Sequence, residues 1–402
     1  MPSVPLSAVI GRAGHPAAPQ RILAVQTQRI GDALCFTPLL TALRRRFPDA
    51  RLTALVQPPA HELLLTNPDL DGLIVYEPGA IRGRLGPLLA LAGRLRRERF
   101  DWAFVIHAAR SVTWTISLAR IPWRTCVWRY GAGARPAYHR LYHQAIVQDR
   151  RRGEQHEVEY NLDALRALGV QPEHDGIRVP IEAEAAVGAQ AALNAAGVLP
   201  GAPFVVLHPG HAGGRQEWPL EQFARLGDLL AGRLGWEIVL TGSAREATRC
   251  ARTAAAMRCR AHNLAGKLDL EELAALLHSA RLYVSVPTGP MHLAAAVGTP
   301  VVALYGPEEL AADRVRFAPY AGGLAPCTRE PGAGSKGPHH AAVCSPAACD
   351  CPAMRACRTA TCMRAITPGA VFIAAVRLIG ACPAPREVTS AAQPPFRALR
   401  IS

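Results

Sequence analysis

The sequence predicts an α/β protein built from two doubly wound parallel sheets. Short apolar runs, typical of strands buried on both faces, alternate with helical stretches along the chain. This alternation occurs twice, with a break between the two occurrences. The length of 402 residues, half of them hydrophobic, also favours two domains over one. We therefore expect two sheets and a cleft between them, where ligands commonly bind.

The first half of the chain contains four strand candidates and two clear helices. The strand candidates are residues 21–25, 51–56, 72–75 and 102–106, and the helical stretches are residues 33–46 and 85–97. Strands joined by helices run parallel, because the crossing helix returns the chain to the end of the sheet at which the preceding strand began. We expect this half to form a domain at residues 21–180, after an N-terminal extension at residues 1–20.

The second half repeats the pattern after a break. Its strand candidates are residues 204–207, 237–240, 282–286 and 301–305, and its helices are residues 220–233, 270–280 and 291–297. Pro180, an alanine-rich helical stretch at residues 182–196 and Pro200 mark the break. We place the second domain at residues 181–366, followed by a final helix and a loose tail at residues 367–402.

The segment from residue 282 to residue 307 has the layout of an anion-binding site. A buried strand is followed directly by Thr288, Gly289 and Pro290, which open a helix. Proline fits the first helical turn, where its missing N–H costs nothing. The free amides and the positive dipole end of such a helix attract anions, so a diphosphate is expected there. Thr288 and His292 would flank it.

A second loop of interest follows the first strand, at residues 27–33. Gly31 allows a ligand to approach the backbone, and Asp32 stands at the start of the long helix. An aspartate in a first helical turn can simply complement the helix dipole or cap the helix. It can equally act as a general base that faces the cleft. Spacing alone leaves both interpretations open.

The charge indicates an anionic partner. The net charge is +14 and the pI is about 9.7, which suits nucleic acid, anionic lipid or a phosphorylated glycan. Much of the excess lies in the first half, in Arg44, Arg45, Arg46, Arg82, Arg84, Arg94, Arg96, Arg97, Arg99, Arg150, Arg151 and Arg152. These arginines are either solvated helix faces or a patch for a membrane surface or acceptor. They form no continuous basic arm and accompany no nucleic-acid motif, so nucleic acid is not expected as a partner.

Membrane insertion is not expected from the hydropathy pattern. No run of about 18 uncharged apolar residues occurs, and the first twenty residues lack a signal-peptide pattern. We therefore expect a cytoplasmic protein, with peripheral contact at the inner face of the cytoplasmic membrane.

Five motifs together resemble glycosyltransferase family 9, the lipopolysaccharide heptosyltransferases. In order, they are RILAVQTQRIGDALCFTPLLTALRRRFPDARLTALV, FVVLHPG with EWPLEQF, IVLTGSAREA, NLAGKLDLEELAALL and VPTGPMHLAAAVGTPVVALYGP. The resemblance covers about residues 21–375. It implies a GT-B fold, in which two Rossmann-like domains face a cleft. The first would bind the acceptor and the second the nucleotide-sugar donor, with the final helix crossing back to the first. It implies no metal for catalysis.

The resemblance also assigns roles to individual residues. Asp32 would deprotonate the acceptor hydroxyl, with Gly31 and Arg29 in the same acceptor-side loop. The donor-binding positions, from the phosphate turn to the ribose, the base pocket and the strand ends, are Thr288, Gly289, Pro290, Met291, His292, Glu246, Leu268, His208, Gly210 and Gly242. Residue patterns alone leave Glu246 as a helix-start carboxylate and Leu268 as core packing.

Two departures from the family pattern concern the donor. The family commonly has a lysine where Gln216 stands, two residues before Trp218, and an aspartate where Pro287 stands. Arg215 could supply the missing positive charge, although arginine and lysine differ in geometry. Proline cannot hold a sugar hydroxyl by its side chain. A donor other than ADP-heptose therefore stays open, as does a degenerate protein that only binds nucleotide or glycan.

A cysteine-rich loop spans residues 327–362 of the second domain. Its cysteines are Cys327, Cys344, Cys349, Cys351, Cys357 and Cys362. Free thiols are the first expectation for a cytoplasmic protein, ahead of disulfides. A metal site on Cys344, Cys349, Cys351 and Cys357 is the alternative, although their spacing gives no paired zinc knuckles.

The combined prediction is an inverting glycosyltransferase. We expect it to move a sugar, heptose from ADP-heptose first, onto a lipopolysaccharide core or another lipid-linked or phosphorylated glycan. The nucleotide sugar is its donor substrate, and no cofactor is expected.

Overall fold

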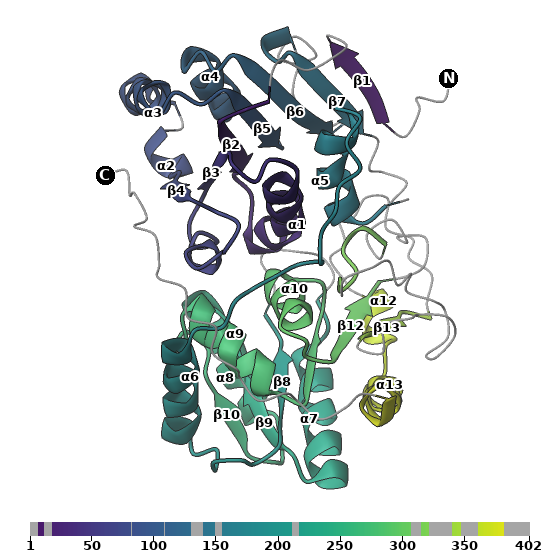
Figure 1. The fold of residues 1–402 in the computed structure, drawn as a ribbon. Coiled ribbons are helices and arrows are strands. Elements are labelled where there is room, and N and C mark those ends of the chain that lie inside the picture. The colour runs from purple at the N-terminus through teal and green to yellow at the C-terminus, as the bar shows by residue number, and fades with distance from the viewer. Residues whose placement is uncertain are drawn as a thin grey trace. The chain divides into compact units, whose positions relative to one another are not determined.

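The computed structural model describes ten stretches of the chain. They are residues 7–11, 18–81, 83–107, 109–129, 140–148, 155–210, 217–306, 315–320, 340–346 and 361–381. The described residues form two compact units, one within residues 1–178 and the other within residues 179–392 (Figure 1). The break lies close to the boundary expected at residue 180.

The first unit is built on a seven-stranded sheet. The strands are β1 (Ser7–Gly11), β2 (Arg21–Gln26), β3 (Arg51–Val56), β4 (Gly72–Val75), β5 (Trp102–Ile106), β6 (Trp123–Arg129) and β7 (Gln144–Gln148). Their order in the sheet is β1-β7-β6-β5-β2-β3-β4. Strand β1 pairs antiparallel with β7, whereas all other neighbours are parallel. The order of the parallel strands reverses between β2 and β5.

Helices cover both faces of this sheet. One face carries α1 (Ile30–Arg46) and α5 (Glu157–Arg166); the other carries α2 (Pro78–Ile81), α3 (Leu85–Arg97) and α4 (Arg110–Leu118), with the short turn η1 (Glu62–Leu64) in the β3–β4 connection (Figure 1). The core under α3 and α4 joins Leu91, Leu95 and Ile116 to β-strand residues such as Val25 and Val105, all of them buried. A sheet that is apolar on both faces requires this double cover.

The second unit is built on a six-stranded, wholly parallel sheet. The strands are β8 (Phe204–His208), β9 (Glu237–Leu240), β10 (Ala261–Asn263), β11 (Leu282–Ser285), β12 (Val301–Tyr305) and β13 (His340–Cys344). Their order is β10-β9-β8-β11-β12-β13, with every neighbouring pair parallel. This order reverses between β8 and β11, which is the arrangement of a doubly wound nucleotide-binding fold.

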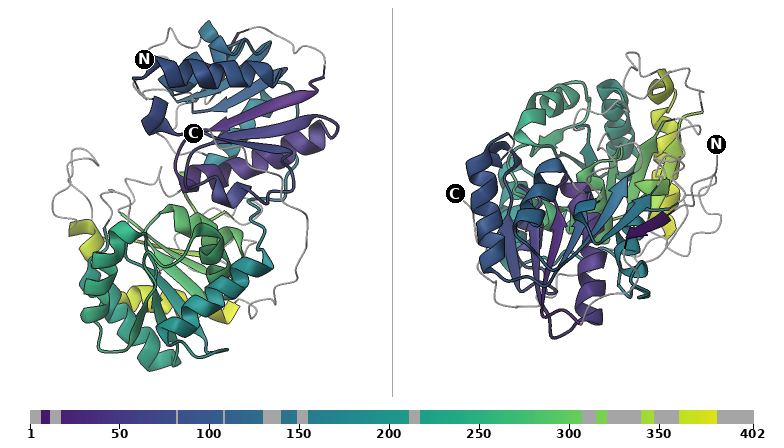
Figure 2. Two further views of the ribbon diagram at one scale, coloured as in Figure 1. Left: turned by 90° about the vertical axis from the view of Figure 1, so that its left-hand side faces the viewer. Right: turned by 90° about the horizontal axis from the view of Figure 1, so that it is seen from above.

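The helices of the second unit again lie on both faces. One face carries α7 (Leu220–Leu234), α8 (Ala247–Ala255), α12 (Thr361–Arg364) and α13 (Pro368–Ala381); the other carries α6 (Ala183–Ala196), α9 (Leu270–Ser279) and α10 (Gly289–Ala296), and η3 (Ala244–Glu246) precedes α8. Figure 2 shows this helix–sheet–helix layering of each unit from two further sides.

Several elements differ from the sequence expectation. The expected extension at residues 1–20 contains β1, which adds an edge strand to the first sheet. The apolar pattern of the sequence did not predict β6 or β7 of the first unit, and it did not predict β10 or β13 of the second unit. The final helix is α13, which packs on α7, β12 and β13 of the second unit, and its crossing back to the first domain stays a prediction. The expected tail at residues 383–402 lies outside the described residues.

Trp218 ties the C-terminal helices to the core of the second unit. Its indole is completely buried and meets the Phe223 ring edge-on, with ring centroids 4.7 Å apart. Its Nε1–H donates to the Ile366 carbonyl at 3.0 Å, in the connection between α12 and α13. A buried backbone carbonyl needs such a partner.

We expect Trp218→Phe to lower the free energy of unfolding by at least about 1–3 kcal/mol, since it leaves the Ile366 carbonyl without this donor. Urea unfolding measures the change. Trp114→Phe is the matched control, because Trp114 is 42% exposed and its substitution should stay within about 0.5 kcal/mol. Equal stabilities of the two variants would contradict the anchoring role of Trp218.

Candidate functional site

In both sheets, candidate site residues lie near the point where the strand order reverses. In an open parallel sheet, such a reversal leaves a crevice outside the carboxyl ends of the two central strands, and ligands bind there. The two crevices lie beyond β2 and β5 in the first unit and beyond β8 and β11 in the second. Most of the expected site residues belong to the loops that follow these strands or their neighbours.

Asp32 lies in the first turn of α1 but does not cap the helix. The N-cap position is Arg29, which is exposed, and no side-chain hydrogen bond caps the helix start. Gly31 and Asp32 are half-buried in the following turn. The interpretation of Asp32 as an N-cap is therefore wrong, although its carboxylate still complements the helix dipole.

His107 and Glu157 join Asp32 at this edge, and sequence reasoning missed both. His107 follows β5 directly and has φ of 59°, a left-handed conformation that is uncommon outside glycine. Its Nε2 lies 2.9 Å from Oε1 of Glu157, which is completely buried at the first position of α5. One polar atom from each of Asp32, His107 and Glu157 lies within 4.8 Å of the other two.

Helix α5 is held so that Glu157 reaches this cluster. The His156 side chain caps α5 by accepting the Val158 N–H at 3.1 Å. Further along the helix, the Asn161 side-chain amide donates to the Cys35 carbonyl of α1 at 2.9 Å. The first bond fixes the start of α5, and the second joins α5 to α1, which carries Asp32.

The cluster of Asp32, His107 and Glu157 can hold or move protons. A buried carboxylate that binds one nitrogen of an imidazole fixes the ring orientation, which is how a carboxylate supports a histidine in general acid–base catalysis. Two carboxylates and an imidazole are also suitable ligands for a divalent cation. The sequence held a signal for neither His107 nor Glu157, because each reads as an isolated polar residue at the end of an element.

In the second unit, α10 begins in the crevice beside β11. Thr288 is its N-cap, with extended backbone, and Gly289 and Pro290 follow as half-buried residues. Pro290 has no N–H, and the Met291 N–H donates to the Thr288 carbonyl at 3.1 Å. Of the first three helical positions, the Gly289 amide is therefore the one left to meet an anion. The Met291 and His292 side chains are buried, at 0% and 3% exposure.

The end of β8 forms a buried polar wall of the same crevice. His208 is buried, and its Nδ1 lies 3.3 Å from Oγ1 of Thr241, at the end of the neighbouring β9. The His208 ring lies 6.3 Å from the Tyr283 ring of β11. Burial raises the pKa of Tyr283, and the nearby Glu246 carboxylate raises it further, so this phenol stays neutral.

Glu246 packs its carboxylate against glycine. Its Oε2 accepts hydrogen bonds from the backbone N–H and the hydroxyl of Ser243, both at 2.8 Å, in a capping box. A Cβ atom on Gly210 would collide with this carboxylate, and one on Gly242 would lie 3.2 Å from the Glu246 Cβ. Glycine at both strand ends therefore leaves the space that Glu246 occupies. Glu246 thus lies at a helix start as the residue pattern indicated, although it is half-buried, and a ribose contact stays a prediction.

Arg249 is a further residue that the sequence did not single out. Its Nε donates to the Pro209 carbonyl at 2.6 Å, its Nη1 pairs with the Glu217 carboxylate at 3.0 Å, and its Nη2 donates to the Trp218 carbonyl at 3.2 Å. Arg249 thereby joins the two ends of segment 211–216. A weak signal existed, because Arg249 lies three residues after Glu246 and such residues share a helix face.

The structure gives little information on the predicted contacts of Arg215, Gln216 and Leu268. Arg215 and Gln216 lie outside the described residues. Leu268 is half-buried just before Asp269, which caps α9 by accepting the Glu272 N–H at 2.7 Å. Base contact and core packing both remain open for Leu268.

The cysteine-rich loop is described only in part. Cys344 is half-buried in β13 and Cys362 is buried in α12, whereas Cys327, Cys349, Cys351 and Cys357 lie outside the described residues. The metal alternative for this loop stays a prediction.

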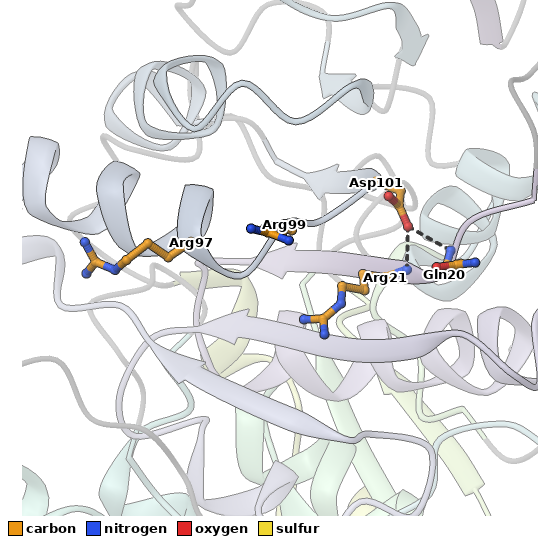
Figure 3. A pocket seen from close by; sticks show the side chains of 5 residues that line it. All are labelled: Gln20, Arg21, Arg97, Arg99 and Asp101. Carbon is orange, nitrogen blue, oxygen red and sulfur yellow. Dashed lines mark hydrogen bonds between the residues drawn. The ribbon is translucent and has the colours of Figure 1, made fainter.

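A cavity of about 500 Å³ lies at the opposite edge of the first sheet, where β2 and β5 begin (Figure 3). Gln20, Arg21, Arg97, Arg99 and Asp101 line it. The Asp101 carboxylate accepts the backbone N–H groups of Gln20 and Arg21, both at 2.8 Å. Because ligands of such sheets bind at the carboxyl ends of the strands, this cavity is not the candidate active site.

Comparison with known proteins finds a matching family and related sequences. The model of glycosyltransferase family 9 (heptosyltransferase) matches residues 88–325. Lipopolysaccharide heptosyltransferase 3 of Escherichia coli K12 is 28% identical over 298 residues, which cover 72% of this chain and 82% of that protein.

Two solved Escherichia coli structures share the fold. That of ADP-heptose lipopolysaccharide heptosyltransferase II has a TM-score of 0.69 and 22% identity, covering 89% of this chain and 98% of that one. That of heptosyltransferase WaaC with ADP has a TM-score of 0.61 and 22% identity, covering 87% of this chain and 97% of that one.

We expect Gly210→Ala to lower the free energy of unfolding by about 1–2 kcal/mol, because the new methyl group displaces the Glu246 carboxylate from its capping box. The φ angle of Gly210 lies outside the left-handed range, so the destabilisation expected from alanine at this position is steric. Gly232→Ala, in the interior of α7 with no atom near its Cβ position, is the matched control and should gain about 0.5–1 kcal/mol. Stabilisation by both substitutions would show that Glu246 is not confined by Gly210.

Proposed function

We propose that this chain, which belongs to glycosyltransferase family 9 (heptosyltransferase), transfers heptose from ADP-heptose to a lipopolysaccharide core or another lipid-linked, phosphorylated glycan. The chain is a glycosyltransferase with two Rossmann-like domains of the GT-B type. The observation that supports the donor site is the start of α10, which presents the Gly289 amide and the helix dipole beyond β11, at the reversal of the strand order.

The donor site would hold the diphosphate chiefly by backbone. The α10 N-terminus supplies partial positive charge that stabilises the leaving diphosphate as its bond to the sugar breaks. Glu246 and Leu268, which follow β9 and β10, are proposed to meet the ribose and the base. Arg249 would hold Pro209, Glu217 and Trp218 together beside the crevice. Arg215 is proposed to supply positive charge to the phosphates.

The reaction proposed is a single displacement with inversion. The acceptor hydroxyl oxygen forms a bond to the anomeric carbon of the sugar, the bond from that carbon to the diphosphate oxygen breaks, and ADP leaves with the electron pair. The hydroxyl proton goes to the Asp32 carboxylate. We propose that His107, oriented by the buried Glu157 carboxylate, positions Asp32 for this transfer.

The sugar is the part of this proposal that has an alternative. Pro287 stands half-buried directly before Thr288, where the family commonly has an aspartate, so the carboxylate that would hold a sugar hydroxyl is missing. Recognition of the diphosphate by amides and a dipole does not depend on that side chain. A different nucleotide sugar is therefore the second candidate donor.

The place of action would be the cytoplasmic face of the membrane, where a lipid-linked acceptor is presented. Among the described residues, no helix is both long enough and apolar enough to span a bilayer. Contact with the membrane would then be peripheral.

The donor is tested by calorimetric titration of the purified protein with ADP, UDP, GDP and CDP. We expect ADP to bind with clear selectivity, since the WaaC relative is known in a structure with ADP. Preference for another diphosphate would keep the fold and the chemistry but replace the donor. Binding of none of the four would favour a degenerate protein.

We expect Asp32→Asn to lower kcat by at least about a hundredfold, because the amide cannot accept the hydroxyl proton, while the Kd of ADP stays unchanged. Turnover assays and calorimetry measure the two effects. Asp49→Asn is the control, since Asp49 is an exposed aspartate and its variant should keep full turnover. Normal turnover by Asp32→Asn would remove this residue from the mechanism.

We expect Glu157→Gln to lower kcat by about tenfold to a hundredfold with little change in the Kd of ADP, because the neutral amide holds His107 less firmly. His107→Asn should give the same pattern. A fall in donor affinity instead of kcat would indicate a purely structural role. Loss of activity after dialysis against EDTA, restored by Mn²⁺, would favour the cation interpretation of the Asp32, His107 and Glu157 cluster.

A further inference from the structure

We propose that the outer surface of α3 and α4 in the first unit docks on an anionic lipid bilayer. This α3–α4 surface consists of Leu85, Leu89, Trp114 and Leu118 together with the surrounding arginines Arg84, Arg94, Arg96, Arg97, Arg110 and Arg120. The inference rests on the proposed function in one respect, because a lipid-linked acceptor explains why the enzyme would need a bilayer.

Large apolar side chains gather on these two helices. Leu85 is 70% exposed, Leu89 is 49% exposed, and Trp114 and Leu118 are each 42% exposed. Leu85 and Leu89 are four residues apart on α3, as are Trp114 and Leu118 on α4. The two members of each pair therefore lie one above the other on a single helix face. Half of the exposed large hydrophobic residues in the described part of the chain belong to this surface. Tryptophan with leucine is the composition that enters the interfacial region of a bilayer.

The charge of the same helices suits an anionic surface. Neither α3 nor α4 contains an aspartate or a glutamate. Arg84, Arg96, Arg97, Arg110 and Arg120 are exposed, and Arg94 is half-buried. Each arginine near an anionic leaflet contributes about 1 kcal/mol to the free energy of membrane binding. Its long apolar stem can lie along the interface. A second copy of the same surface is a poor partner, because a symmetric contact would set arginine against arginine.

The α3–α4 surface also continues from the candidate catalytic edge. The two helices pack side by side on one face of the first sheet (Figure 1). Helix α4 begins at Arg110, three residues after His107, and the next two turns of its exposed face carry Trp114 and Leu118. A bilayer against this surface would therefore lie near the loops that hold Asp32 and His107 within the same unit. A lipid-anchored acceptor could then reach those loops without leaving the membrane.

The test is co-sedimentation of the full chain with vesicles. We expect binding to vesicles that contain phosphatidylglycerol, little binding to pure phosphatidylcholine, and loss of binding at high salt. The double variant Trp114→Ser with Leu118→Ser should bind at least about tenfold more weakly, because it removes apolar area that the bilayer would bury. The matched control is Val187→Ser with Leu199→Ser, two residues of the second unit that are 71% and 72% exposed. This control should bind as the unaltered protein does.

Three outcomes would overturn the inference. They are equal binding of the double variant and the unaltered protein, equal binding to neutral and anionic vesicles, and a dimer in solution that the double variant dissociates. Calorimetry with ADP separates this inference from the proposed function. If the double variant loses vesicle binding but still binds ADP, the result supports the docking surface. If the unaltered protein binds vesicles but no nucleotide, the result counts against the enzyme proposal alone.

Discussion

The structure depends on one constraint, the parallel pairing of strands joined by helical crossovers. Each crossover must carry the chain over a face of the sheet, so helices accumulate on both faces and the strands become apolar throughout. In each sheet the chain first winds one way from the central strand and then the other way. The reversal falls between β2 and β5 in the first unit and between β8 and β11 in the second. No crossover covers these two points, and the site residues lie there.

Several buried or partly buried polar groups at these edges have partners from distant parts of the chain. Glu157 meets His107, His208 meets Thr241, and Arg249 meets three acceptors around segment 211–216. A charge or a polar atom removed from water is tolerated only with such partners. The same bonds that make burial tolerable also fix the orientation of the functional side chains, so that stability and site geometry cannot be varied separately.

Two kinds of recognition meet in this enzyme, and they differ in how they tolerate substitution. A diphosphate at the start of α10, as proposed above, would be recognised by the Gly289 amide and the helix dipole, which survive a change of neighbouring side chains. A sugar hydroxyl is recognised by a particular side chain, and Pro287 offers none. The proposed diphosphate contact therefore depends on backbone and helix geometry, whereas selection of the sugar would depend on side chains such as the one replaced by Pro287. The bilayer docking proposed for the arginines around α3 and α4 would add a third, less specific recognition of negative charge.

The sequence by itself determined the local features of this protein. The strands β2 and β11, the helix α10 with its Thr288 and Gly289 turn, and the place of Asp32 in a first helical turn were all predictable, because apolar periodicity and turn chemistry act over a few residues. Only the tertiary structure decided the rest. Three sets of contacts join residues far apart in the chain. They are the pairing of β1 with β7, the cluster of Asp32, His107 and Glu157, and the hydrogen bonds of Arg249 with Pro209 and Glu217. In the sequence, His107 and Glu157 are an isolated histidine and an ordinary helix-start glutamate. They become a site because burial brings them together and removes the water that would otherwise solvate each of them.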